Sequence, residues 1–367
     1  MKIQIEKKDL INLIGKTQNI VEKRNTMPVL VNVLLEALDQ QLTVFATDLE
    51  VSLTDSVTAQ VQTPGKVGVS AKSLFEITKE LSEGPIQLIR RDNNWLEIKQ
   101  GKYTSKIVGI SAEEYPIFPT PARNDFVSLE AVVLKDMIDK TIYSVSTDES
   151  RYHLNGVYFE PKDGGYVMVA TDGHRLSLIS KKIPAATALG QQGVIIPRKG
   201  LHEIKKLIEG LNDSLQLAIE GAQLIVRHGS TTLMIRLIEG KYPNYSQFIP
   251  QKLAEKISIN REAFLQSLKR VSLLANHKSK AVTLSIVAGK MEITSNNPEL
   301  GDAKEEIEIE YKGREFKIGF NAKYIQDVLQ VIADETIDIE LNDQTSPGLM
   351  RPHNDSRYTC VVMPMRI

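Results

Sequence analysis

The sequence has almost none of the features that support disulfide frameworks, metal centres or membrane insertion. A single cysteine, Cys360, occurs in 367 residues, which excludes an internal disulfide and a CxxC metal site. No run of about 18 or more apolar residues is present, so no membrane span is expected. The N-terminal residues also lack the apolar segment of a signal peptide. We therefore expect a cytoplasmic protein.

An excess of positive charge is missing as well. The 45 lysines and arginines are balanced by 46 aspartates and glutamates, and the net charge is −1. A protein that holds DNA through phosphate contacts alone is usually clearly basic. The composition therefore argues against a tight, static nucleic-acid binder. It does not exclude a protein that holds DNA by its shape.

Patterns typical of catalysis are absent or incomplete. Gly15-Lys16-Thr17 resembles the end of a phosphate-binding loop, but Leu10 stands where that motif needs a further glycine. Asp172-Gly173-His174-Arg175 could supply an acid and a base, but no GxSxG nucleophile motif accompanies it. The six histidines show neither HxxxH nor HExxH spacing. We expect no catalytic residue, no metal and no cofactor, and we interpret Asp172 as a turn residue.

Three landmarks recur along the chain with a period the size of a domain. Ala46-Thr47-Asp48-Leu49 returns as residues 170–173 and, more faintly, as residues 294–297, at steps of 124 positions. A second landmark opens a helical pattern each time, at Ala71-Lys72, Pro197-Arg198 and Ala322-Lys323. Such a period is too long for a solenoid repeat. The sequence therefore predicts three similar domains at residues 1–121, 122–252 and 253–367.

Each domain divides again into two halves with the same pattern. Amphipathic periodicity predicts helices at residues 7–24, 72–83, 130–143, 198–209, 261–280 and 321–334. Asn260 and Asn321 are placed to cap two of them. Alternating runs predict antiparallel strands at residues 41–46, 86–90, 166–170, 215–219, 224–227, 283–287 and 337–341. The predicted class is α+β, with two β-α-β-β-β halves per domain and helices on one side of the sheets.

The predicted helices are more basic than the rest of the chain, with 19 basic and 13 acidic residues. Two interpretations remain open. The charges are either those of ordinary solvated helix faces, or they form a surface that tolerates a polyanion without gripping it.

The C-terminal residues 361–367 are unusually apolar for a chain end. They form either a docked strand or an adaptable surface for partner peptides, because methionine repacks easily. Cys360 just before them is interpreted as a small buried hydrophobic residue.

Several segments taken together resemble the bacterial DNA polymerase III beta subunit, the sliding clamp family. They are residues 24–30, 151–156, 170–176, 196–200 and 362–367. The resemblance spans the whole chain, with matching length and the threefold repeat. It implies a DNA clamp fold in which two subunits form a ring, with sheets outside and helices inside. Twelve helices packed about 10 Å apart would leave a hole of roughly 28 Å, enough for a duplex.

The family resemblance also implies a function and functional residues. The protein would be a processivity factor without its own catalytic site, a head-to-tail homodimer that encircles DNA in the cytoplasm, associated with the nucleoid. Its partners would be duplex DNA and, through short peptides, the replicative polymerase, the clamp loader and repair polymerases. The implied DNA-binding residues are Arg24, Lys72, Tyr152, His153, Arg198 and Lys199. The implied peptide pocket comprises Leu154, Thr171, Gly173, His174, Arg175, Leu176, Pro243, Phe248, Val361, Met363, Pro364, Met365 and Arg366. The implied dimer interface includes Ile107, Leu273 and Leu274.

Two local departures from the family pattern bear on this assignment. Gln247 and Phe248 stand where many relatives carry arginine and valine, so peptide preference differs. The Asp148-Glu149 loop is acidic where a neutral donor is expected, which weakens the expected DNA contact there. Two other hypotheses compete with the clamp. One is a monomeric repeat scaffold that binds peptides, and the other is a hydrolase that uses Asp172 and His174.

Overall fold

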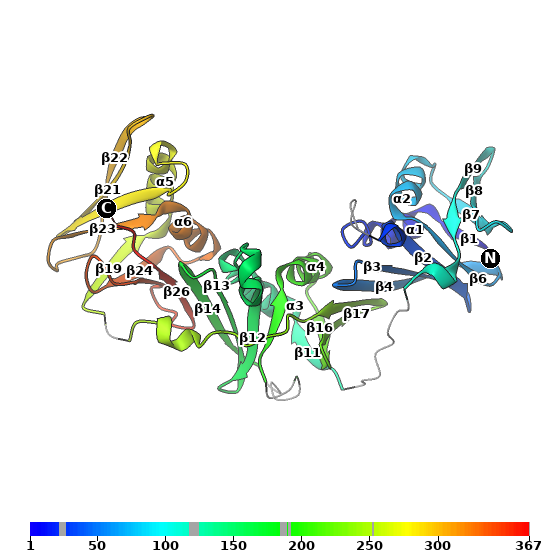
Figure 1. Cartoon of the computed structure of the whole chain (residues 1–367), viewed down its shortest axis with the longest axis horizontal. Helices are drawn as coiled ribbons and strands as arrows, with labels where there is room; N and C mark the ends of the chain where they lie inside the picture. Colours follow the sequence, from blue (N-terminus) through cyan, green and yellow to red (C-terminus); the bar gives the residue numbers. More distant parts are fainter. Residues whose placement is uncertain (22–26, 117–124, 184–188, 190–191, 252, 367) are drawn as a thin grey trace. The chain divides into compact units, whose positions relative to one another are not determined.

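The computed structural model describes residues 1–21, 27–116, 125–183, 189, 192–251 and 253–366. The chain, drawn in Figure 1, forms two compact units. Unit 1 comprises Met1–Val132 and Lys199–Leu237, and unit 2 comprises Val133–Arg198 and Ile238–Ile367. These units do not follow the predicted domains, because the middle third of the chain is divided between them.

Within the described residues, one pattern of strand, helix and three strands occurs six times. The helices are α1 (Lys7–Gly15), α2 (Ala71–Glu80), α3 (Ala131–Asp139), α4 (Arg198–Ile208), α5 (Arg261–Val271) and α6 (Ala322–Val331). Short additional strands lie after the first two repeats. The predicted α+β class with two β-α-β-β-β halves per domain is confirmed.

Unit 1 contains two antiparallel sheets. The five-stranded sheet has the order β5 (Gln60–Thr63), β1 (Lys2–Glu6), β7 (Pro85–Arg90), β8 (Leu96–Gln100) and β9 (Tyr103–Ile107). The nine-stranded sheet has the order β10 (Gly109–Ile110), β6 (Gly65–Ser70), β2 (Asn32–Leu38), β3 (Gln41–Thr47), β4 (Val51–Thr58), β18 (Thr231–Arg236), β17 (Gln223–His228), β16 (Ser214–Glu220) and β11 (Val127–Glu130).

Unit 2 also contains two antiparallel sheets. The eight-stranded sheet has the order β15 (Val194–Pro197), β12 (Gly156–Lys162), β13 (Gly165–Thr171), β14 (Arg175–Lys182), β26 (Tyr358–Val362), β25 (Gly348–Pro352), β24 (Thr336–Leu341) and β19 (Glu255–Asn260). The four-stranded sheet has the order β22 (Gly301–Glu308), β21 (Lys290–Asn297), β20 (Ala281–Val287) and β23 (Phe316–Asn321).

The first strand of each half pairs with the other half of its domain. β1 pairs with β7, and β6 pairs with β2. The same exchange joins β11 to β16 and β15 to β12, and then β19 to β24 and β23 to β20. Neither half of a domain can therefore complete its sheet alone.

Two strand pairings join successive domains, and we name them joints. The first joint is the pairing of β4 with β18 in unit 1, where Val51 lies opposite Ile235. The second joint is the pairing of β14 with β26 in unit 2, where Arg175 lies opposite Val362. The C-terminal strand is therefore docked between β14 and β25, in agreement with one of the two interpretations of the chain end.

The helices form where apolar residues recur every three to four positions. Leu10, Leu13 and Ile14 of α1 are buried, and the predicted stripes of the other five helices are largely buried in the same way. Asn260 caps α5 by accepting a hydrogen bond from the backbone N–H of Ala263 at 2.9 Å. Asn321 caps α6 through the N–H of Lys323, also at 2.9 Å. Both predicted caps are confirmed.

All six helices end before the predicted residue, and α1 and α5 end nine residues early. The helix expected over residues 7–24 stops at Gly15, after which the Thr17 hydroxyl donates to the carbonyl of Ile14 at 2.7 Å. The helix expected over residues 261–280 stops at Val271, whose carbonyl accepts a hydrogen bond from Ser295 at 2.7 Å. In both cases a hydroxyl satisfies a terminal carbonyl, which periodicity alone does not reveal.

Candidate partner and DNA sites

The turn between β13 and β14 is built by its own side chains. The Asp172 carboxylate accepts hydrogen bonds from the N–H groups of His174 (2.9 Å) and Arg175 (3.0 Å). The Thr171 hydroxyl accepts one from the N–H of Gly173 at 3.1 Å. Gly173 has a φ of 88°, which glycine adopts without strain. Asp172 is therefore a turn residue, as interpreted from the sequence, and its oxygens hold the turn backbone and the Arg175 guanidinium rather than a catalytic histidine.

The C-terminal segment lies against this turn. The N–H of Met363 donates to the carbonyl of His174 at 2.9 Å, which continues the pairing of β26 with β14. The N–H of Met365 donates to the carbonyl of Gly319 at 2.8 Å. The backbone is thus fixed at two points, while 42% of Met363 stays exposed. A fixed backbone with an exposed, flexible thioether suits contact with varied apolar side chains.

A cavity of about 90 Å³ opens beside the turn. It is lined by Thr171, Gly173, Arg175, Leu176, Phe248, Val361 and Met363. Every one of these residues belongs to the predicted peptide pocket. Phe248, one of the two departures from the family pattern, is 54% exposed at its rim. The structure therefore brings seven predicted residues around one apolar depression.

The other predicted pocket residues lie around this cavity without lining it. Leu154 is buried in a cluster with Leu176 and Val361, beneath the lining. Pro243 follows Tyr242, another member of that cluster. His174 lies in the turn, with its ring centroid 6.5 Å from that of Tyr324. Pro364, Met365 and Arg366 continue beyond Met363 and are at least partly exposed.

Arg175 forms one wall of the cavity and is held from several sides. Its guanidinium bonds to the carboxylates of Asp172 (3.0 Å) and Asp327 (2.6 Å). It also lies 4.5 Å from the ring centroid of Tyr324, and it donates to the carbonyl of Tyr143. Burial works to lower the pKa of Arg175, but the ion pairs with the two aspartates outweigh it and raise the pKa. The charge is therefore permanent and fixed in place.

Behind Arg175 lies a buried polar network that the sequence did not reveal. The hydroxyls of Tyr143 and Tyr358 are 2.7 Å apart, and the Tyr143 hydroxyl lies 3.2 Å from the Cys360 sulfur. The Ser177 hydroxyl donates to Tyr143 at 2.5 Å. Burial raises the pKa of the Cys360 thiol, so it stays protonated and unreactive. Cys360 is fully buried as interpreted, although it also takes part in hydrogen bonding.

The predicted DNA-binding residues are distributed over both units. Lys72 is exposed on α2 and lies 3.6 Å from Glu76. Tyr152 is 58% exposed, and its ring meets that of His153 edge to face. Arg198 is exposed at the start of α4, whereas Lys199 forms an ion pair with the buried carboxylate of Asp48. Arg24 lies outside the described residues.

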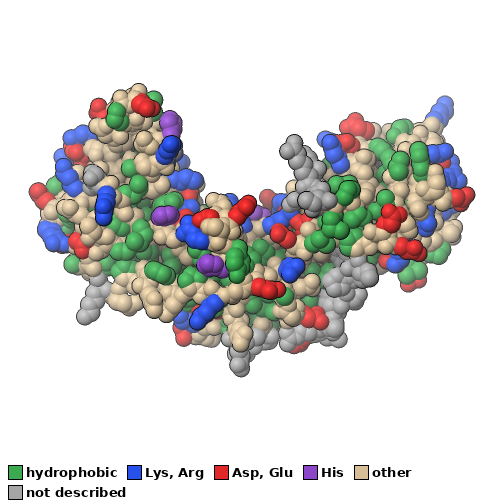
Figure 2. Space-filling view, viewed as in Figure 1, with side chains coloured by type: hydrophobic (Ala, Val, Ile, Leu, Met, Phe, Trp, Pro, Cys, Tyr) green, Lys and Arg blue, Asp and Glu red, His purple; other side chains and the backbone are tan. Residues whose placement is uncertain are grey.

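The acidic loop near Tyr152 is partly neutralised by its own arginine. Asp148 accepts hydrogen bonds from the N–H of Ser150 (3.0 Å) and from Arg151 (2.9 Å). On the face shown in Figure 2, acidic and basic side chains are likewise interleaved over each unit rather than separated. Neither unit therefore presents a continuous basic stripe on this face.

The predicted interface residues lie beside two strands with an open edge. Ile107 ends β9, which among the described strands pairs only with β8. Leu273, which is 74% exposed, and Leu274 form a short 3₁₀ helix (Ser272–Leu274) after α5. That helix packs against β22, which among the described strands pairs only with β21.

No cluster of histidine, cysteine or acidic residues that could hold a metal occurs in the described part of the chain. The described helices include none that is long and apolar enough to cross a membrane.

Comparison with known proteins agrees with this architecture. Residues 1–119, 128–244 and 246–366 match models of the N-terminal, central and C-terminal domains of the DNA polymerase III beta subunit. The beta sliding clamps of Caulobacter vibrioides and Pseudomonas putida are 34% and 32% identical, over 100% of both chains. A crystal structure of the C. crescentus beta sliding clamp matches with a TM-score of 0.95 and 33% identity over 100% of both chains. The sliding clamp of Bartonella birtlesii bound to griselimycin matches with a TM-score of 0.96 and 31% identity over 100% of both chains.

The fold and these matches define a DNA clamp, a processivity subunit that has no catalytic role of its own. The chain belongs to the DNA polymerase III beta subunit family, the bacterial beta sliding clamps. The resemblance inferred from five short segments is confirmed over the whole chain. Family membership also removes the hydrolase hypothesis for Asp172 and His174.

Proposed function

We propose that two copies of this chain form a closed head-to-tail ring that encircles duplex DNA and tethers polymerases to it. The observation that carries the ring is that two edge strands, β9 in unit 1 and β22 in unit 2, lie beside the predicted interface residues. Antiparallel pairing of β9 with β22 of a second copy would join a five-stranded sheet to a four-stranded one. The same pairing at the other end would close the ring and leave neither edge open.

Side chains near these edges support the same interface between the two copies. Leu273 and Leu274 would pack beside Ile107 of the other copy, covering an exposed leucine. β22 carries four acidic residues and one lysine (Asp302, Glu305, Glu306, Glu308 and Lys304), while Lys99 and Lys106 lie on β8 and β9. Opposite charges on the two edges would select this pairing over self-pairing of either edge.

Retention on DNA would then come from topology rather than from tight contact. Arg24, Lys72, Tyr152, His153, Arg198 and Lys199 are the proposed DNA-binding residues. The net charge of −1 and the Lys199–Asp48 ion pair support loose contact, which permits sliding. We propose that the domains end near residues 121 and 252 and that the protein acts in the cytoplasm at the nucleoid.

The cavity beside residues 171–175 is the proposed peptide pocket. Short segments of the replicative polymerase, clamp loader and repair polymerases would insert apolar side chains there. The predicted pocket residues supply apolar walls, and Arg175 adds a fixed charge. Deleting residues 363–367 should abolish peptide binding while leaving the dimer intact, because β26 ends at Val362. Unchanged peptide affinity would refute the pocket assignment.

The ring is tested by solution mass and by DNA topology. Light scattering at micromolar concentration should give twice the 41.0 kDa of one chain. After loading, the protein should stay on circular DNA and leave linear DNA through its ends. A monomer would instead support the peptide-binding scaffold, and equal retention on both DNA forms would refute encirclement.

A further inference from the structure

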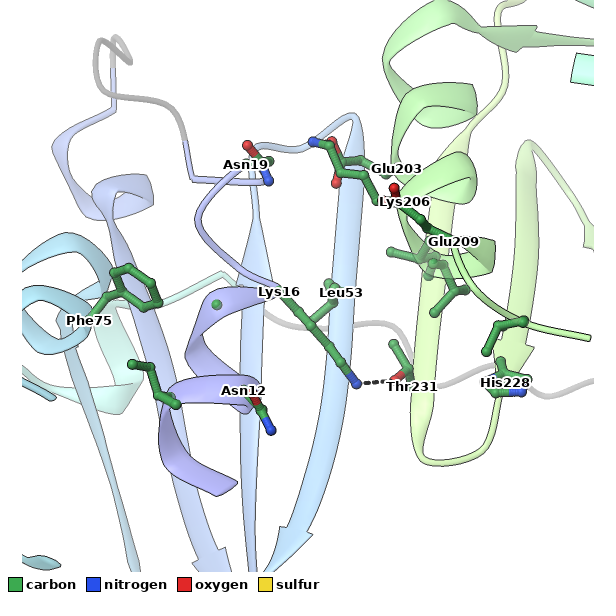
Figure 3. A pocket seen from close by; sticks show the side chains of 15 residues that line it. Asn12, Lys16, Asn19, Leu53, Phe75, Glu203, Lys206, Glu209, His228 and Thr231 are labelled. Carbon is green, nitrogen blue, oxygen red and sulfur yellow. Dashed lines mark hydrogen bonds and ion pairs between the residues drawn. The ribbon is translucent and has the colours of Figure 1, made fainter. Parts of the chain in front are cut away.

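A cavity of about 840 Å³ lies at the first joint, within unit 1 (Figure 3). The end of α1, Phe75 of α2, helix α4 and strands β4 and β18 surround it. Leu53, Leu207 and Phe75 supply apolar walls, and Asn19 and Thr231 supply polar ones. Its volume falls within the roughly 300–1,000 Å³ of small-molecule sites. Neither the clamp function nor the proposed peptide pocket uses it.

The internal repeat shows what occupies the matching place at the second joint. Thr17 and Thr141, 124 positions apart, each donate to a carbonyl near the end of the preceding helix. By the same offset Asn19 corresponds to Tyr143. Because Val51 faces Ile235 and Arg175 faces Val362, Thr231 corresponds to Tyr358. The first joint therefore has two small side chains where the second has two tyrosines.

Those tyrosine rings fill the second joint. Tyr358 is fully buried, and its hydroxyl meets that of Tyr143 at 2.7 Å. The Lys140 ammonium lies 5.4 Å from the Tyr358 ring centroid, a cation–π distance. Lys16 is the counterpart of Lys140, and its ammonium instead bonds to Thr231 at 3.0 Å. A ring in the cavity would thus meet a lysine in the same way as Tyr358 does.

The polar groups of the cavity define the rest of the ligand. Among the described residues, the side-chain amides of Asn12 and Asn19 have no hydrogen-bond partner. Lys16 is paired with Asp55 and Lys206 with Glu203, each at 2.6 Å. Glu209 also lines the cavity and has no ion-pair partner within the described part of the chain. Of the four lysine and glutamate side chains that line the cavity within the described residues, Glu209 alone has no ion-pair partner, and it favours a cationic group beside it.

We propose that this cavity binds a small aromatic amine that carries a phenolic hydroxyl. The phenol ring takes the place that tyrosines fill at the second joint, between the apolar walls and beside Lys16. The hydroxyl bonds to Asn19, and the ammonium group is attracted by Glu209. This site goes beyond the clamp function and does not depend on ring closure or on peptide binding.

Three related probes test the chemistry on the full-length protein by calorimetry and saturation-transfer NMR. Tyramine has the ring, hydroxyl and ammonium. Phenethylamine lacks the hydroxyl, and 4-hydroxyphenylacetate reverses the charge. We expect tyramine to bind with a Kd on the order of 1 mM. Phenethylamine should bind about fivefold more weakly and 4-hydroxyphenylacetate at least about tenfold more weakly. No saturation transfer from tyramine at about 10 mM, or equal affinity for all three probes, would overturn the proposal.

A filled cavity tests the location. The double variant Asn19→Tyr/Thr231→Tyr copies the second joint and should weaken tyramine binding by about tenfold or more. Thr232→Tyr is the matched control, because successive residues of a strand point to opposite faces. If the double variant does not fold, Thr231→Tyr alone replaces it. Unchanged tyramine affinity in a folded, filled variant would place the ligand elsewhere and refute this site.

Discussion

The two joints share one backbone arrangement and differ in the side chains that lock it. At the second joint, Arg175 reaches Asp327 of α6 and lies between the rings of Tyr143 and Tyr324. The first joint has different residues 124 positions earlier: Val51 for Arg175, Glu203 for Asp327, Asn19 for Tyr143 and Gly200 for Tyr324. The two joints therefore share the strand pairing and differ in the side chains that stabilise it.

The outer turns of the joints differ in the same way. Asp48 and Asp172 each accept hydrogen bonds from the N–H groups two and three residues onward. Gly173 leaves space for the cavity at the second joint, whereas Leu49 stands at that position at the first joint, with a φ of 76°. One joint is thus open beside its turn and filled between its helices, and the other has a large cavity between its helices. The two copies of the joint therefore present different surfaces.

The largest expected effect comes from removing the cation of the second joint. Arg175→Met removes the buried cation between the carboxylates of Asp172 and Asp327 and leaves Asp327 with only the exposed Lys323 at 3.1 Å, and we expect a loss of about 3 kcal/mol in the free energy of unfolding. Urea denaturation measures it. Arg357→Met, which removes an exposed ion pair with Asp355, is the control and should cost less than about 1 kcal/mol. Equal losses in both variants would show that Arg175 does not stabilise the second joint.

The next effect concerns the proposed peptide pocket. Gly173→Leu copies the first joint, but an added Cβ would lie 2.8 Å from a guanidinium nitrogen of Arg151. We expect peptide affinity to fall about 100-fold, or about 2.7 kcal/mol. Gly210→Leu has a similar φ of 77° with nothing within 4 Å, and it controls for backbone strain. Fluorescence anisotropy of a labelled clamp-binding peptide should separate the two variants.

A smaller effect is expected at the first joint. The Lys16 ammonium bonds to the buried Asp55, which also accepts from Ser230 at 2.7 Å. Lys16→Met should cost about 1–2 kcal/mol, less than Arg175→Met, because Ser230 still satisfies the carboxylate and water reaches the half-exposed site. Thermal unfolding of both variants gives the ranking. A larger loss at Lys16 would reverse the comparison.

The smallest effect is a difference in acid sensitivity. Burial tends to raise the pKa of Asp136, but hydrogen bonds from Lys181 and Lys140 outweigh it and lower the pKa below 3.8. The stabilisation that follows from this lowered pKa is present above the pKa of Asp136 in the unfolded chain. It is lost as the pH falls through the pKa of Asp136 in the folded protein. The first joint has the neutral Asn12 at this position. Asp136→Asn should therefore make the free energy of unfolding depend less on pH below about pH 4, with a change of less than about 1 kcal/mol. An unchanged profile would contradict this role.

The sequence predicted the repeated pattern well because each half follows a clear periodicity. The helix stripes, the caps Asn260 and Asn321 and the turn role of Asp172 were all visible in it. The strand exchange was not, because pairing of β11 with β16 depends on contacts about 90 positions apart. Periodicity predicts elements, whereas partners in a sheet are set by the whole fold.

The residues of the proposed pocket could be predicted from the sequence only in part. Each residue lining the small cavity was named in advance from the family resemblance. Tyr143 and Asp327 were missed, because tyrosine and aspartate on a helix or turn usually look like ordinary surface residues. Aligning the repeats would have shown Tyr143 against Asn19 and Arg175 against Val51. Such differences between copies were the available signal.

The position of β26 makes the proposed peptide pocket depend on two strands that lie far apart in the sequence. Val361 and Met363 line the cavity, and they come from the final seven residues. During synthesis, residues 171–176 are made almost two hundred positions before the strand that pairs with them. A nascent chain that has not reached β26 therefore lacks Val361 and Met363, two residues that line the proposed pocket. The proposed pocket can therefore form only after β26 has paired with β14, which couples the proposed peptide binding to the pairing that joins the second and third domains.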